Sequence, residues 1–201
     1  MKFLVGPAAL LAFVLGLSEH ASAADLVGTL TLDANSRISI DASDPLPIPA
    51  GSTIRFHFGE PAEDGTVPVS LAPADVQIDP VKLPDGRRMH YTLADAARGT
   101  LKRGTGGLTL TLDATVRVGV AGRMGREVRD YPAFFTTEST IAVNDKRTRL
   151  QTLRGQKISE SARTVTLVAG ATNAGDAAIS KGEAVSVVLI GTFDRLPSLA
   201  P

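Results

Sequence analysis

Apolar and polar residues alternate over much of this chain. In residues 107–120, leucine, valine and alanine fall on every second position, and threonine, Asp113 and Arg117 lie between them. Residues 53–58 alternate in the same way. A period of two residues is typical of β-strands that bury one face and expose the other. The pattern predicts a strand at both places, and the first is long against a usual length of about 5–6 residues.

Most of the chain is predicted to form strands. Besides these two segments, strands are expected near residues 26–33, 36–41, 67–71, 75–78, 87–93, 139–144, 147–153, 162–170 and 184–193. Turns rich in Pro, Gly and Asx separate them, and only residues 93–99 favour a turn or two of helix. This arrangement predicts an all-β fold, a secreted antiparallel β-sandwich of immunoglobulin-like or Greek-key type with about ten strands and little helix.

One hexapeptide occurs twice. TLTLDA occupies residues 29–34 and 109–114, and an arginine follows each copy at the same spacing, at Arg37 and Arg117. Weaker echoes recur in the same order: VSLA at 69–72 with VTLVA at 165–169, and GTLKR at 99–103 with GTFDR at 191–195. Leucine facing inward and threonine facing outward is ordinary strand sequence. We therefore interpret the hexapeptide as a strand segment and not as a catalytic motif.

The repeated segments leave two interpretations of the domain organisation. We predict one continuous sandwich domain over residues 24–201, because the segment KRGTGG at 102–107, where two units would meet, is a very short linker. The alternative is an internal duplication, which would give two related halves at 24–103 and 104–201.

The first residues favour export. Lys2 precedes an apolar stretch at 3–17, and the small residues Ala21-Ser22-Ala23 follow it. This order predicts a signal peptide at residues 1–23, with a retained N-terminal anchor as the alternative. The apolar stretch is shorter than the about 20 residues of a membrane-spanning helix. We expect an exported protein, periplasmic or extracellular at the cell surface, that does not span the membrane after cleavage.

Composition removes several classes of chemistry. The chain has no Cys and no Trp, and its net charge is zero. Without cysteine the chain has no disulfides, no thiol nucleophile and no thiolate metal site. A protein that binds nucleic acid usually carries a strongly basic domain, so no nucleic-acid partner is expected.

No catalytic, cofactor-binding or metal-binding residue is predicted. Residues 24–201 contain two histidines, His57 and His90, and each is predicted on the exposed side of a strand. Neither lies in an HExxH spacing, and no Gly-x-Ser-x-Gly elbow occurs. Acidic loops such as 60–66 could hold Ca²⁺, although Asx residues are more typical of turns. We therefore predict a protein that is not an enzyme, and a hydrolase is disfavoured.

The strongest candidate for a recognition surface is the segment RDYPAFFTT at 129–137. It brings Arg129, Tyr131, Phe134 and Phe135 close together in a chain with few aromatic residues. Exposed aromatic residues beside arginine are favoured at binding interfaces. The alternative is that Tyr131 and Phe135 fill one end of the sandwich.

Taken together, these features predict a structural, adhesive or binding protein of the cell envelope. The alternative function is an extracellular module that binds a ligand or a glycan. Its partner could be another protein or a cell-surface polymer, and the alternating residues 24–34 could add a strand to a second copy. An outer-membrane barrel is disfavoured, because such barrels carry aromatic girdles and this chain has no Trp and two Tyr.

Overall fold

The computed structural model describes residues 26–40, 45–83, 85–122, 125–138, 140–144, 150–170 and 185–199. The predicted signal peptide lies outside this part of the chain. The strands are β1 (Leu26–Leu32), β2 (Arg37–Ile40), β3 (Leu46–Pro47), β4 (Thr53–Phe58), β5 (Val67–Leu71), β6 (Val76–Gln77), β7 (Val81–Lys82), β8 (Arg88–Leu93), β9 (Ala97–Gly104), β10 (Gly107–Gly122), β11 (Gly125–Thr136), β12 (Thr140–Asn144), β13 (Leu150–Arg154), β14 (Thr164–Gly170) and β15 (Val185–Phe193). The helical element among these residues is a single short 3-10 helix, η1 (Pro73–Asp75), and nothing helical there is long and apolar enough to cross a bilayer.

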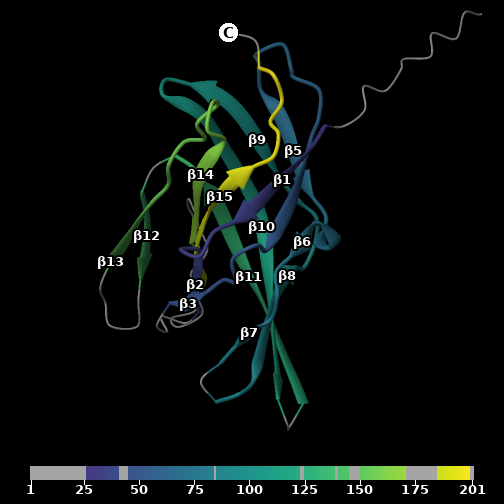
Figure 1. The fold of residues 1–201 in the computed structure, drawn as a ribbon, viewed down its shortest axis with the longest axis vertical. Coiled ribbons are helices and arrows are strands. Elements are labelled where there is room, and N and C mark those ends of the chain that lie inside the picture. Colours follow the sequence, from purple (N-terminus) through teal and green to yellow (C-terminus); the bar gives the residue numbers. More distant parts are fainter. Residues whose placement is uncertain are drawn as a thin grey trace, which may run out of the picture.

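Eight of the strands close into an antiparallel barrel (Figure 1). The order is β1-β4-β5-β9-β10-β11-β14-β15, and β15 pairs with β1 again, Leu30 with Phe193 and Leu32 with Gly191. The chain is all-β, but the predicted immunoglobulin-like sandwich is wrong. Alternation shows only that one face of a strand is buried, and a sandwich and a barrel both bury one face. The closure depends on pairing between distant strands, which no local pattern reports.

The smaller strands lie against the edges of the barrel strands. β2 follows β1 along the edge of β15, and β3 pairs with β2. β6 pairs with β4, β7 pairs with β8, and β12 and β13 form a separate two-stranded sheet. The predicted turn of helix at 93–99 is absent from the structure, where strand β9 begins at Ala97.

β10 is the longest strand, with sixteen residues. One side pairs with β11 from Thr111 to Gly122. The other side pairs first with β9, up to Asp113, and then with β8 from Val116 onward. Beyond β9, the ends of β10 and β11 leave the barrel body and extend next to the β7–β8 hairpin (Figure 1). The long alternating segment of the sequence is therefore partly barrel wall and partly an arm.

The inward residues of the alternation form the core. One cluster of buried apolar side chains takes members from all eight barrel strands. A barrel of eight strands has an interior just wide enough to be filled by its own side chains or to hold one small ligand. How completely the interior is filled therefore determines what this fold can do.

Candidate functional site

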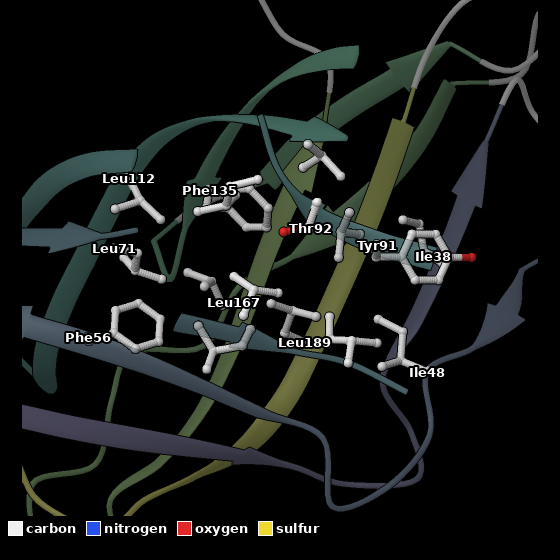
Figure 2. Close-up of a pocket in the computed structure, with 16 residues that line it drawn as sticks. Ile38, Ile48, Phe56, Leu71, Tyr91, Thr92, Leu112, Phe135, Leu167 and Leu189 are labelled. Carbon is white, nitrogen blue, oxygen red and sulfur yellow. The ribbon is translucent and has the colours of Figure 1, made fainter. Parts of the chain in front are cut away.

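An apolar cavity of about 60 Å³ lies inside the barrel (Figure 2). Its lining belongs to six barrel strands and to the strands and loops next to them. The lining residues are Ile38, Ile48, Ile54, Phe56, Leu71, Val76, Ile78, Tyr91, Thr92, Leu93, Leu112, Val116, Phe135, Leu167, Val187 and Leu189. The interior is thus not completely filled by the side chains of the chain itself.

The strand period of two places these side chains around the cavity. In β10, Leu112 and Val116 are buried and line the cavity, whereas Asp113 is exposed on the opposite face. Leu167 in β14 and Leu189 in β15 reach the cavity from the neighbouring strands, which pair in register at these two residues. Because successive side chains of a strand point to opposite faces, the barrel wall presents mainly aliphatic groups to the cavity.

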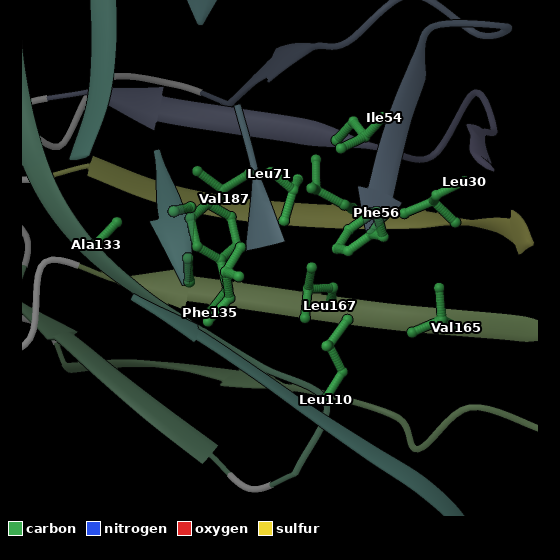
Figure 3. Close-up of a cluster of buried hydrophobic side chains, with 14 of the residues drawn as sticks. Leu30, Ile54, Phe56, Leu71, Leu110, Ala133, Phe135, Val165, Leu167 and Val187 are labelled. Atoms are coloured by element: carbon green, nitrogen blue, oxygen red, sulfur yellow. The ribbon is translucent and has the colours of Figure 1, made fainter. Parts of the chain in front are cut away.

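The neighbouring part of the interior is closely packed. The rings of Phe56 and Phe193 meet edge to face with their centres 5.2 Å apart, and Phe58 lies 6.4 Å from Phe56. Figure 3 shows Phe56 and Leu30 meeting side chains from the opposite wall in the same core. Aromatic pairs at such separations add stability beyond the area that they bury. The cavity therefore adjoins a rigid, filled region of the barrel.

The polar groups at the border of the cavity already have partners. The Thr92 hydroxyl donates to the Pro73 carbonyl at 3.3 Å, and the Tyr91 hydroxyl donates to the Met89 sulfur at 2.7 Å. Burial raises the pKa of the Tyr91 hydroxyl, so this group stays neutral. In Figure 2 the Tyr91 hydroxyl points away from Leu167 and Leu189. The cavity therefore offers close contact to apolar groups and little hydrogen bonding.

A cavity of this kind has an energetic cost whenever nothing fills it. Its lining then lacks partner atoms on one side and loses the corresponding dispersion contacts. At about 24 cal/mol per Å³ of unfilled cavity, the volume of about 60 Å³ corresponds to about 1.5 kcal/mol. An apolar molecule that restored the contacts would recover part of this free energy. Water would not, because a water molecule needs two or more polar partners.

His57 has a partner that the sequence did not predict. Its Nε2 lies 3.0 Å from Asp75 Oδ2, and Arg55 approaches the same carboxylate at 3.2 Å. The Ala72 N–H also donates to Asp75, whose residue is only 4% exposed. These contacts fasten η1 to the outer face of β4. Ser70 stands opposite His57 in the strand register, but none of these residues lines the cavity, and His90 is exposed.

The four residues of the predicted recognition surface separate onto two faces of β11. Tyr131 and Phe135 are 4% and 6% exposed and point into the barrel, where Phe135 lines the cavity. Phe134 is half-buried on the other face, and Arg129 is exposed. The recognition surface stays a prediction, and Arg129 and Phe134 are the members within reach of a partner.

Acidic residues in the described loops organise turns. Asp33 accepts the Asn35 N–H at 2.7 Å, and Asp64 accepts the Thr66 N–H at 2.9 Å. The contacts with Thr66 hold the pKa of Asp64 below its usual range. Among the residues that the structure describes, no three His, Asp or Glu side chains gather where they could hold a metal ion. The acidic residues at 41–44 and 173–183 lie outside the described residues.

No protein-family model, curated protein or solved structure matches this chain.

Proposed function

We propose that this chain is an exported, non-enzymatic binding protein that takes one small apolar molecule into its barrel. The observation that supports the proposal is the apolar cavity lined by strands of a closed sheet. Binding sites for small molecules are concave, mostly apolar and largely preformed. Eight-stranded barrels are wide enough to hold one small ligand.

The lining favours an apolar ligand over a glycan. A sugar carries hydroxyl groups, and each would lose its hydrogen bonds to water on entering the barrel. The hydroxyls of Thr92 and Tyr91 are already engaged. Aliphatic and aromatic groups lose no hydrogen bonds there, and they gain contacts with the side chains of Leu167, Leu189 and Phe135.

The volume limits the ligand to a short alkyl chain, since a cavity that binds benzene measures about 150 Å³. One water-sized group occupies about 10–15 Å³ of such a cavity. The cavity of about 60 Å³ therefore has room for several methyl- or methylene-sized groups. Export is supported by the order of residues at 1–23, and the binding role follows the alternative of a ligand-binding module outside the cytoplasm.

Thermal unfolding with and without an apolar probe tests this proposal. We expect propane or n-butane to raise the melting temperature of the chain that begins at Ala24, since a ligand at 100 times its Kd stabilises by about 2.7 kcal/mol. Val187→Phe places a ring in the cavity and should abolish the rise. Leu189→Met keeps the volume of the lining and should preserve it.

The outcomes separate clearly. If the parent chain shows no shift with either probe and no change in the NMR signals of the lining methyl groups, the proposal is wrong. Should Val187→Phe fail to fold, Val116→Phe fills the cavity from β10 and provides the same test. A shift that persists in a folded, filled variant would place the probe elsewhere on the protein and would also contradict the proposal.

A further inference from the structure

The lining of the cavity comes close to solvent on one side. Val76, Ile78 and Thr92 are partly exposed, and every other lining residue is buried. Val76 and Ile78 belong to residues 73–78, which comprise η1, β6 and the residue after β6. Thr92 lies in β8, which packs against both η1 and β6. Residues 73–78, here called the gate segment, therefore cover the side of the cavity that is nearest to solvent.

Few backbone hydrogen bonds hold the gate segment to the barrel. β6 has two residues, which pair with β4 as Gln77 with Thr53 and Val76 with Ile54. By contrast, β14 pairs with β15 along all seven of its residues. β3 is as short as β6, but the neighbouring Ile48 is buried. Segments with few backbone hydrogen bonds open locally at a lower free energy than long paired strands, so the gate segment is an easily opened part of the cavity wall.

Side-chain contacts close the gate segment from outside. Asp75 Oδ1 lies 3.2 Å from the Arg55 guanidinium, and Asp75 Oδ2 lies 3.0 Å from His57 Nε2. Asp75 is only 4% exposed. The Thr92 hydroxyl also donates to the Pro73 carbonyl at 3.3 Å. One buried carboxylate thus connects the gate segment to two side chains of β4.

Alternation along the gate segment separates its two roles. Val76 and Ile78 line the cavity, whereas Asp75 and Gln77, which alternate with them, do not. The contacts that hold the segment therefore lie outside the cavity, and its apolar side chains lie inside. A change at Asp75 should alter how often the segment opens and leave the surface that meets a ligand as it is.

We propose that the gate segment is the entrance of the cavity and that the Asp75 carboxylate holds it closed. The inference rests on the proposed function for the identity of the entering molecule, a small apolar ligand. When the contacts of Asp75 with β4 break, Val76 and Ile78 can leave the lining at the loss of the short β4–β6 pairing. The eight barrel strands stay paired, so the ligand can enter without unfolding of the barrel.

The access of a thiol reagent to the cavity tests the gate without any ligand. The chain has no cysteine, so Val187→Cys places a single thiol in the lining. The matched control Val165→Cys places one in the same core but outside the lining. Val187 and Val165 are both buried, at 4% and 2% exposed. We expect methyl methanethiolsulfonate to modify Val187→Cys faster than Val165→Cys.

Removing the carboxylate should widen this difference. Asp75→Asn loses the charged hydrogen bonds to β4 and should accelerate labelling of Val187→Cys about tenfold or more. Labelling of Val165→Cys should change little, and the exposed Asp79→Asn should leave both rates unchanged. If Asp75→Asn does not fold, Arg55→Gln removes one of the contacts from an exposed position and should act in the same direction.

A reversible crosslink provides the converse test. Thr53 and Gln77 stand directly opposite each other, and such residues have Cα atoms about 4.5–5.5 Å apart, within disulfide range. The disulfide of Thr53→Cys/Gln77→Cys should slow the exchange of n-butane, followed by NMR, about tenfold or more, and reduction should restore it. The matched disulfide of Thr100→Cys/Thr111→Cys, between β9 and β10, should leave the exchange unchanged.

The outcomes distinguish the gate from the proposed function. Equal acceleration of both thiols in Asp75→Asn would show that the whole barrel opens and would overturn the inference. Unchanged labelling of Val187→Cys would also overturn it, even in a chain that binds n-butane, as would an n-butane exchange rate that is indifferent to the β4–β6 crosslink. Labelling that depends on Asp75 in a chain that binds no n-butane would support the gate and contradict only the proposed function.

Discussion

Two three-stranded parts of the barrel wall pair their strands in the same register, and both are built from the segments that the sequence repeats. In each part, three residues on neighbouring strands stand directly opposite one another and form a row. In the sheet β14–β15–β1, Val165 pairs with Gly191, which pairs with Leu32. The corresponding row in β5–β9–β10 is Val69, Gly99 and Leu112. Each row thus combines one copy of TLTLDA with one VSLA-like and one GTLKR-like segment.

The two rows also share a close backbone approach. A Cβ at Gly191 would lie 2.3 Å from the Thr31 carbonyl oxygen, and a Cβ at Gly99 would lie 1.8 Å from that of Thr111. Glycine inside a strand often marks such an approach. Matched registers and matched glycines are what a duplicated half-barrel would produce. The two related halves, 24–103 and 104–201, stay a prediction.

The two copies differ directly after the hexapeptide. In the first copy, residues 33–36 stand opposite only two residues of β15 and form a bulge. The Asn35 N–H donates to Asp33, and the buried Ser36 hydroxyl bonds both the N–H and the carbonyl of Ile190 at 3.0 Å. In the second copy, β10 continues without interruption along β11.

Residue types explain this difference. Asn and Ser hydrogen-bond the nearby backbone and compete with regular pairing, whereas Thr115 and Val116 at the corresponding places are β-branched and suit a strand. After the bulge the chain continues as β2, which pairs with β15 just as β1 does before it. The straight strand carries the second copy out of the barrel as the arm that extends next to the β7–β8 hairpin. The identity of two residues after the shared hexapeptide therefore decides whether the chain stays in the barrel wall or continues into the arm.

The largest effect on stability is expected when the equivalent core leucines of the two copies are truncated. Leu30 and Leu110 are both fully buried. We expect Leu30→Ala and Leu110→Ala each to lower the free energy of unfolding by about 2–5 kcal/mol, through lost burial and the cavity left behind. Urea denaturation measures both, with the exposed Thr31→Ala as control. A loss in one copy several times that in the other would show that the two walls are not equivalent.

A smaller effect is expected at the bulge. Ser36→Ala removes the hydroxyl from the part-buried backbone groups of Ile190, whose carbonyl still accepts the Asp33 N–H, and should cost about 1 kcal/mol. Hydrogen exchange at the Ile190 N–H should accelerate at the same time. The exposed Ser70→Ala serves as the matched control. If Ile190 exchange is unchanged in Ser36→Ala, the hydroxyl does not sustain the bulge.

The smallest effect concerns the arginines that follow the two copies. Arg117 bonds Asp130 and holds the pKa of that exposed carboxyl below its usual range, whereas Arg37 stands opposite Pro47 and Val188. The contribution of Asp130 to stability is therefore present above the ordinary Asp pKa and is lost as pH falls through the lowered value.

NMR titration of the Asp130 carboxyl checks this prediction. In Arg117→Gln the pKa should return toward the ordinary value of 3.8, and acid unfolding should shift only slightly. The same substitution at Arg37 should leave the Asp130 titration unchanged. An Asp130 pKa that does not respond to Arg117→Gln would contradict the pairing.

The sequence located most of the barrel strands but not β9 or β11, and it did not show that the sheet closes. Alternation of apolar residues with polar residues or proline locates β4, β5 and β10, because burial of one face imposes that period. It does not report that β15 returns to β1, since this contact joins residues far apart in the chain. The bulge at 33–36 depends on Ser36 meeting Ile190, which is again a contact between distant segments.

The candidate site was only partly predictable, for the same reason. The period of two assigns Phe135 and Tyr131 to one face and Phe134 to the other, so the predicted recognition surface was divided between core and exterior. A cavity remains where side chains from opposite strands do not fill the space between them. Alternation within one strand carries no information about that packing. The contact of His57 with Asp75 requires η1 to lie against the outer face of β4. No pattern in the local sequence indicated this packing.

The pairing of β1 with β15, which closes the barrel, also constrains the order in which the chain can fold. While the chain is being made, every segment through β14 can emerge before the strand that completes the circle exists. A fragment lacking β15 would keep two open edges and no sealed interior. The ring can therefore be completed only after β15 has been synthesised.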